Sequence, residues 1–243
     1  IIGQYHSSLV IPVLLLAIAS MVASVIMPYL SGDWERGNRD SVARNTNATL
    51  QLYGFAAFCA GAAVLLFSPL VFGWALQGKY DGGLSVLPWT LAISVWAGLL
   101  AISMCYLRCA ERVGIATVGP IIGLVANVAL NLLLLPRLGL LGAVLATAAA
   151  NLLTFLIGLY VCSREGFRIE RGTIWIALLP LGLTLGLPIA LLTAVVTLWA
   201  IVRTEWVCNR ENKESVLNQL QIRLPSRFTH LAYRPLFSLP ATE

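Results

Sequence analysis

The chain has 243 residues, of which 58% are hydrophobic and 11% are charged, and its formal net charge is +5. So few charged residues lie far outside the composition of soluble globular domains and indicate a membrane protein. The charges occur in short gaps and in the C-terminal region. The positive net charge therefore describes loops and a tail, and it does not support binding to nucleic acid.

Six intervals contain no Asp, Glu, Lys or Arg: residues 1–32, 45–78, 82–107, 113–136, 138–163 and 172–202. About twenty uncharged residues in a helix match the roughly 30 Å of hydrocarbon in a bilayer. The first five intervals predict membrane-spanning helices at 9–30, 48–76, 84–107, 113–135 and 140–162, with a polar, turn-rich loop at 31–47. The sequence thus predicts an all-α fold, a polytopic transmembrane helical bundle.

The fourth and fifth spans are expected to form a tight hairpin, because Pro136 should end the first helix and Gly139 permits a sharp reversal. Small and amide residues recur at a spacing of four on both helices: Gly119, Gly123, Asn127 and Asn131 on the first, and Gly142, Ala146 and Ala150 on the second. Small residues at this spacing let helices approach closely inside lipid. Two interpretations of the asparagines remain: hydrogen bonds between the helices, or side chains that face a hydrophilic cavity.

The hairpin also carries a pattern that is similar to that of a known family. Between Asn127 and Thr147 the chain reads Asn-x-x-x-Asn, followed by Pro-x-x-Gly-x-x-Gly-Ala-x-x-Ala-Thr. This resembles the polysaccharide-biosynthesis membrane proteins, which are flippases of O-antigen and lipid-linked oligosaccharides in the superfamily that also holds multidrug and toxic compound extrusion transporters. Further segments match in order over about residues 1–165: Gly3-Gln4-Tyr5, Met27–Ser31, Phe72-Gly73, Gly78-Lys79-Tyr80 and Leu107–Arg112.

The resemblance implies that residues 1–165 form the C-terminal lobe of a two-lobe transporter, whose N-terminal lobe would precede Ile1. The two lobes would flip a lipid-linked sugar by alternating access, with a hydrophilic cavity between them and the lipid tail left among membrane lipids. Arg108 and Arg112, at a helix end, suit recognition of a phosphate. The alternative is that both arginines only anchor the topology.

Two other functions stay open: a cation-coupled multidrug exporter of the same superfamily, and a membrane scaffold that transports nothing. No acidic residue lies within a predicted span. Residues that couple transport to a cation would therefore have to belong to the other lobe.

Enzymatic chemistry has no support in the sequence. There is no Gly-rich phosphate loop and no pair of carboxylates, and the two histidines, His6 and His230, lie at opposite ends of the chain. The five cysteines suit small apolar packing better than a metal site or a disulfide. We therefore expect no catalytic residues, no bound metal and no cofactor.

Positive charges in the loops predict the orientation. The first, third and fifth loops hold three, two and three Lys or Arg, against one each in the second and fourth. The positive-inside rule then places the first, third and fifth loops in the cytoplasm of a bacterial-type inner membrane. Asn47-Ala48-Thr49 fits the glycosylation sequon, but a cytoplasmic loop would not be modified.

The last apolar stretch, within 172–203, is an additional broken membrane segment. Pro180, Gly182, Gly186 and Pro188 interrupt it, and a single straight helix of thirty residues would be about 45 Å long. We expect two short helices that meet near Gly186 and return the chain to the cytoplasm, rather than one tilted helix. Residues 204–243 would then form a cytoplasmic tail, partly an amphipathic helix and partly disordered.

Overall fold

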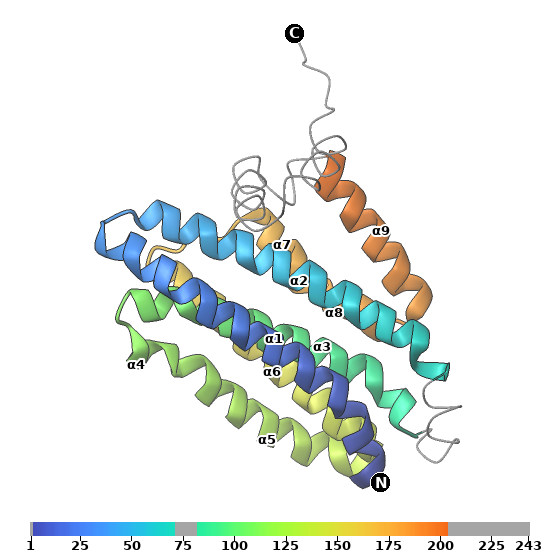
Figure 1. Cartoon of the computed structure of the whole chain (residues 1–243). Helices are drawn as coiled ribbons and strands as arrows, with labels where there is room; N and C mark the ends of the chain where they lie inside the picture. The colour runs from blue at the N-terminus through green and yellow to red at the C-terminus, as the bar shows by residue number, and fades with distance from the viewer. Residues whose placement is uncertain (1, 71–81, 204–243) are drawn as a thin grey trace.

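The computed structural model of the chain describes residues 2–70 and 82–203, which are helical apart from short connections (Figure 1). The helices are α1 (Ile2–Glu35), α2 (Arg39–Leu70), α3 (Gly82–Cys109), α4 (Val113–Ala116), α5 (Val118–Leu138), α6 (Leu140–Arg164), α7 (Arg171–Leu178), α8 (Pro180–Thr184) and α9 (Leu187–Arg203). Five helical stretches in these ranges are long and apolar enough to cross a membrane. The predicted all-α polytopic bundle is confirmed.

The expected polar loop at 31–47 is wrong, because α1 continues to Glu35 and α2 already begins at Arg39. Polar residues do not break a helix that has left the hydrocarbon, since water and neighbouring side chains satisfy them there. Asn38 accepts a hydrogen bond from the Ser41 amide at the start of α2, as helix-capping residues do. The connection between the two helices is therefore a short turn.

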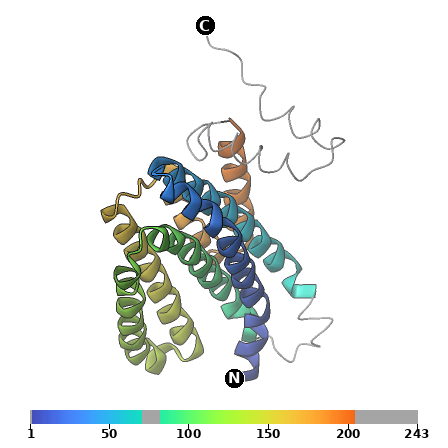
Figure 2. The same cartoon turned by 60° about the vertical axis from the view of Figure 1, so that its left-hand side comes forward.

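Helix α3 lies at the centre of the bundle. It packs against α1 and α2 on one side and against α6 on the other, and it also contacts α8 (Figures 1 and 2). Its most apolar stretch is 72% buried inside the protein, against 11% for the stretch that contains α5. Trp96, near the middle of α3, is buried and donates its indole N–H to the carbonyl oxygen of Ala177 at 2.9 Å.

An aromatic cluster closes the end of the bundle where α1 turns into α2; we call this the aromatic end. The ring of Tyr106 meets Trp34 edge-on at 5.6 Å and Phe167 at 5.0 Å between centroids. The Arg39 guanidinium lies 4.6 Å from the centre of the Trp34 ring, and Tyr106 donates its hydroxyl to the Glu165 carbonyl. Helices α1, α2 and α3 and the connection after α6 are thus joined at one place.

The α5–α6 hairpin forms the outer edge of the bundle. Its turn consists of Gly139, with φ of 57°, as expected from the sequence. Pro136 does not end the first helix, because α5 continues to Leu138 with the proline inside its last turn. The fixed φ of proline is compatible with a helix, and in the last turn the ring removes only the one hydrogen bond that an N–H at this position would donate to the Leu132 carbonyl.

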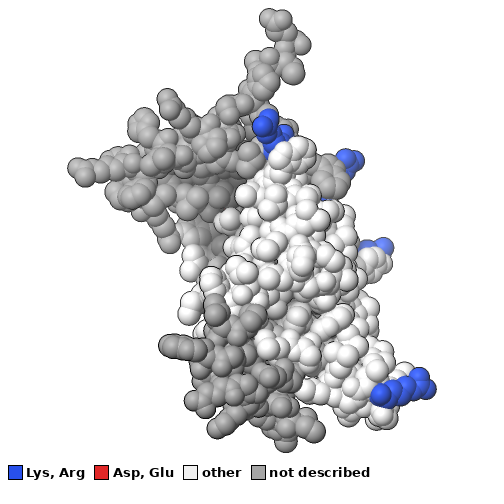
Figure 3. Space-filling model, turned by 90° about the vertical axis from the view of Figure 1, so that its right-hand side faces the viewer, with Lys and Arg blue, Asp and Glu red and all other residues white. Residues whose placement is uncertain are grey.

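The outward surface of the bundle is apolar, as a lipid-facing surface must be. Large exposed hydrophobic side chains cover α5 and α9, among them Leu124, Leu132, Leu192 and Trp199. The face in Figure 3 shows uncharged residues over its described part, with Lys and Arg only at the edges. Such a pattern fits a protein held in hydrocarbon with its charges in the headgroup layers.

The last apolar stretch is a broken hairpin, as the sequence predicts. The chain reverses at Gly186, whose φ is 104°. The Trp175 indole on α7 donates to Thr197 Oγ1 on α9 at 3.1 Å, so the two arms lie side by side. A single tilted helix is excluded. The predicted tail, 204–243, lies outside the described residues.

Replacing Gly186 with Ala should destabilise the protein by about 1–3 kcal/mol, because a side chain at this positive φ is strained. The matched control is Gly32→Ala, inside helix α1, where an added Cβ meets no atom within 4 Å. Reversible unfolding in mixed detergent and SDS micelles measures both changes. Equal stability of the two variants would contradict the strain at Gly186.

Candidate functional site

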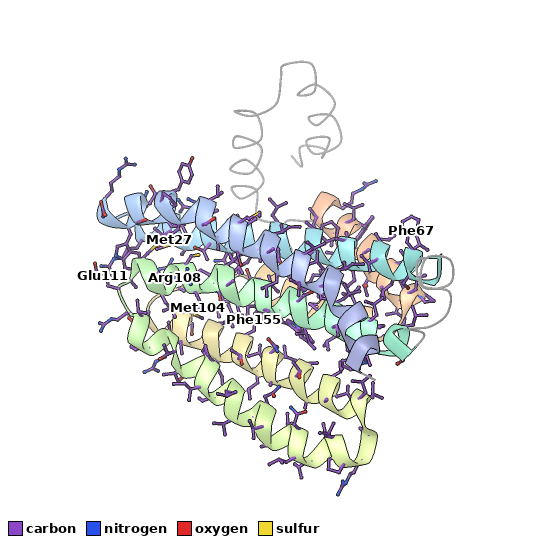
Figure 4. All side chains as sticks on the ribbon, turned by 60° about the horizontal axis from the view of Figure 1, so that its bottom comes forward. Met27, Phe67, Met104, Arg108, Glu111 and Phe155 are labelled. Carbon is purple, nitrogen blue, oxygen red and sulfur yellow. The ribbon has the colours of Figure 1, made fainter. Side chains whose placement is uncertain are left out.

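An open cavity of about 700 Å³ lies between α1 and α3, toward the aromatic end. Its lining comes from one face of α1 and from two residues of α3: Ser20, Ala23, Ser24, Met27, Pro28, Ser31, Ala101 and Arg108. Figure 4 shows Met27 and Arg108 between these two helices, near the end marked by Glu111. The side chain of Arg108, in the last turn of α3, is exposed.

The cavity is weakly polar and carries one positive charge. Each lining serine donates its hydroxyl to its own helix: Ser20 to the Leu16 carbonyl, Ser24 to Met21 and Ser31 to Met27. Their hydroxyl oxygens keep the capacity to accept a hydrogen bond. Arg108 is the charged residue of the lining, and its guanidinium can bind a phosphate or carboxylate with two parallel hydrogen bonds.

Arg112, which the sequence grouped with Arg108, is not part of this lining. Its Nε lies 3.4 Å from Glu165 Oε2, and this ion pair joins the connection after α3 to the end of α6. The Arg112 side chain is 59% exposed, so the ion pair contributes little stability. The structure therefore separates the two arginines into a cavity residue and a residue of the helix connections.

The two predicted asparagines lie in the seam between α5 and α6. Asn127 donates its amide to Thr147 Oγ1 on α6 at 3.3 Å. Asn131 donates to the side-chain and backbone oxygens of Asn127, both at 2.9 Å, within its own helix. Asn151 donates its amide to the Thr147 carbonyl within α6. Neither Asn127 nor Asn131 belongs to the lining of the α1–α3 cavity, and a role for them in substrate binding stays a prediction.

The small residues predicted for helix packing lie in the same seam. A Cβ added to Gly119 would stand 3.3 Å from the Thr154 carbonyl oxygen, and one added to Gly123 would collide with the Thr154 hydroxyl. A Cβ on Gly142 would collide with the Leu134 carbonyl of the opposite helix. Ala146 and Ala150 are buried. At these positions the helices are too close for a larger residue without a shift.

Two sets of residues were missed from the sequence. The serines of α1 recur at spacings of four and seven, which was the available signal that they share a face. Asn47 and Gln51 on α2 are also one turn apart, and both are buried. The sequence showed Asn47 only as part of a sequon, yet its side chain makes four hydrogen bonds, one to Ala43 of its own helix and three to loop 165–170 and α7.

A double-mutant cycle between Asn127→Leu and Thr147→Val tests the hydrogen bond between α5 and α6. We expect a coupling of about 0.6 kcal/mol, and at most about 1.7 kcal/mol, as for other interhelical bonds in membranes. Unfolding in detergent and SDS gives the free energies. Asn131→Leu serves as the comparison, because its bonds stay within α5. Zero coupling, together with loss of transport at normal stability, would favour the cavity interpretation instead.

Comparison with known proteins agrees with this architecture. The model of the lipid II flippase MurJ family matches residues 3–216, which includes the broken hairpin as well as the first five spans. No curated protein and no solved structure matches the chain. The superfamily inferred from the hairpin pattern is confirmed, whereas an O-antigen type of flippase is not. Members of the matched family are inner-membrane transporters of a lipid-linked precursor and not enzymes. The chain belongs to the MurJ lipid II flippase family.

Proposed function

We propose that this chain carries part of the translocation path for a lipid-linked sugar of the lipid II class, and that it works by alternating access against a preceding lobe. The family match is the evidence for the substrate class. It favours a peptidoglycan precursor over the O-antigen precursors suggested by the hairpin pattern. The cavity between α1 and α3 would receive part of the polar head.

The chemistry of the cavity suits such a head. A sugar linked to a lipid through a diphosphate carries negative charge that cannot cross hydrocarbon unaided. Arg108 offers a fixed positive charge, and the serines of α1 offer polar surface without adding further charge. A single arginine cannot balance the negative charge of a diphosphate, so we propose that the preceding lobe supplies further positively charged or hydrogen-bonding groups.

The alternative of a cation-coupled drug exporter receives less support. In the described helices, acidic residues occur only near the ends, such as Asp33, Glu35 and Asp40. A coupling carboxylate within the hydrocarbon would therefore have to come from the other lobe. A non-transporting scaffold would need neither the cavity nor Arg108.

Arg108→Gln should lower the rate of flipping by about ten- to a hundredfold, since a hydrogen bond to a charged group is worth about 1.5–3 kcal/mol. Arg112→Gln is the matched control and should stay near the wild-type rate. Proteoliposomes with labelled lipid II, and separately with an O-antigen-type lipid-linked glycan, provide the assay. Unchanged flipping by Arg108→Gln, or flipping of only the second substrate, would contradict the proposal.

We also propose that the aromatic end faces the cytoplasm and that the tail lies on the same side. The positive charges of the first, third and fifth loops support this orientation. A cysteine in place of Asn218, with the native cysteines removed, should escape an impermeant maleimide in right-side-out cells. Labelling without permeabilisation would contradict the proposed side of the tail.

A further inference from the structure

Asn47 joins the broken hairpin to the rest of the bundle. It lies on α2, is 1% exposed, and donates to the Arg168 carbonyl at 2.8 Å and to the Ala43 carbonyl of its own helix at 3.0 Å. Its Oδ1 accepts from the Glu170 amide at 3.3 Å and from the Thr173 hydroxyl at 2.6 Å. One side chain thus holds loop 165–170 and the first turn of α7 against α2.

This arrangement caps α7 from a neighbouring helix. The first amides of a helix need acceptors, and the side chain of Glu170, the N-cap residue of α7, accepts no capping hydrogen bond from them. Asn47, on the neighbouring helix α2, supplies an acceptor instead, because its Oδ1 accepts from the Glu170 amide. One turn further along α2, Gln51 Nε2 donates to Glu170 Oε2 at 2.9 Å. We call Asn47, Gln51, Glu170 and Thr173 the α2–α7 clasp.

The remaining contact between the hairpin and the bundle is mostly close apolar packing. Ile176 lies against Gly54, and Leu183 lies against Gly61. Apolar packing in a bilayer has no hydrophobic drive behind it, because lipid tails are as apolar as the side chains, so it resists sliding only weakly. Directional hydrogen bonds fix position, and they occur at the clasp and again at Trp96, which donates to the Ala177 carbonyl.

We propose that the α2–α7 clasp makes the α7–α9 hairpin and helices α1–α3 a single rigid body, with Asn47 as the positioning residue. The hairpin then travels with the lobe whenever the lobe moves and does not open as a separate gate. Only the transport readout of the clasp rests on the proposed function.

Amide hydrogen exchange tests the clasp without any substrate. Asn47→Leu should raise exchange at residues 169–178 on the order of tenfold, because three bonds that cross from α2 are lost. Thr173→Val removes one of them and should give a smaller rise. The matched control is Thr46→Val: Thr46 is equally buried, but its hydroxyl donates to the Val42 carbonyl of its own helix. Equal exchange in Asn47→Leu and Thr46→Val would overturn the proposal.

A covalent lock tests the rigid body during transport. Gln51→Cys and Glu170→Cys, in a background without native cysteines, are joined by a short bifunctional thiosulfonate in the full chain in proteoliposomes. The locked protein should flip lipid II within about twofold of its unlocked form. Loss of flipping on locking, reversed by reductant, would overturn the proposal, because it would show that the clasp must open.

Rescue separates positioning from a general loss of structure. The Asn47→Leu protein should flip slowly but bind lipid II with unchanged affinity, and the lock should restore most of its rate. Failure of the lock to restore the rate, in a protein whose exchange at 169–178 has returned to normal, would overturn the proposal. If neither protein flips lipid II at all, the proposed function fails, and the exchange experiment still decides the clasp.

Discussion

Inside a bilayer there is no water to satisfy a polar group, and this constraint explains most of the specific contacts in the protein. The indole of Trp96 reaches across to a backbone carbonyl of α7, and Asn127 reaches across to Thr147 on α6. Serine and threonine hydroxyls of the spans bond back to their own helices, as Ser94 and Thr154 do. A polar side chain that bonds to another segment, as Trp96 and Asn127 do, therefore marks a place where two segments meet.

The same constraint separates the two kinds of contact found along α2. Its apolar and small residues allow the hairpin to lie close, and Gly54 leaves room that Ile176 of the hairpin fills, with Leu99 of α3 beside it. Its amide residues, Asn47 and Gln51, fix the position of the hairpin along the axis of α2. Close packing thus gives proximity, and hydrogen bonds give register. The cavity between α1 and α3 is the contrasting case, because there polar atoms face open space.

The sequence predicted the number of spans, the α5–α6 turn at Gly139 and the break near Gly186, because each depends on hydropathy or on one special residue. It failed at 31–47, where helices extend beyond the hydrocarbon and composition no longer reports structure. It also grouped Arg108 with Arg112, although only Arg108 lines the cavity and Arg112 pairs with Glu165. Asn47 could not have been assigned from sequence, since its partners lie more than 120 residues away.

The aromatic cluster at one end of the bundle has a mechanical consequence. Trp34, Tyr106 and Phe167 belong to three segments, and Arg39 brings in a fourth. Packed side chains have low compressibility and transmit strain, so we expect a displacement of one of these segments to shift the others. The described turns that face the opposite way, at Gly139 and Gly186, rest on single glycines. We therefore expect a displacement at the aromatic end to be shared among helices α1, α2 and α3, whereas no comparable side-chain cluster is described at the two glycine turns.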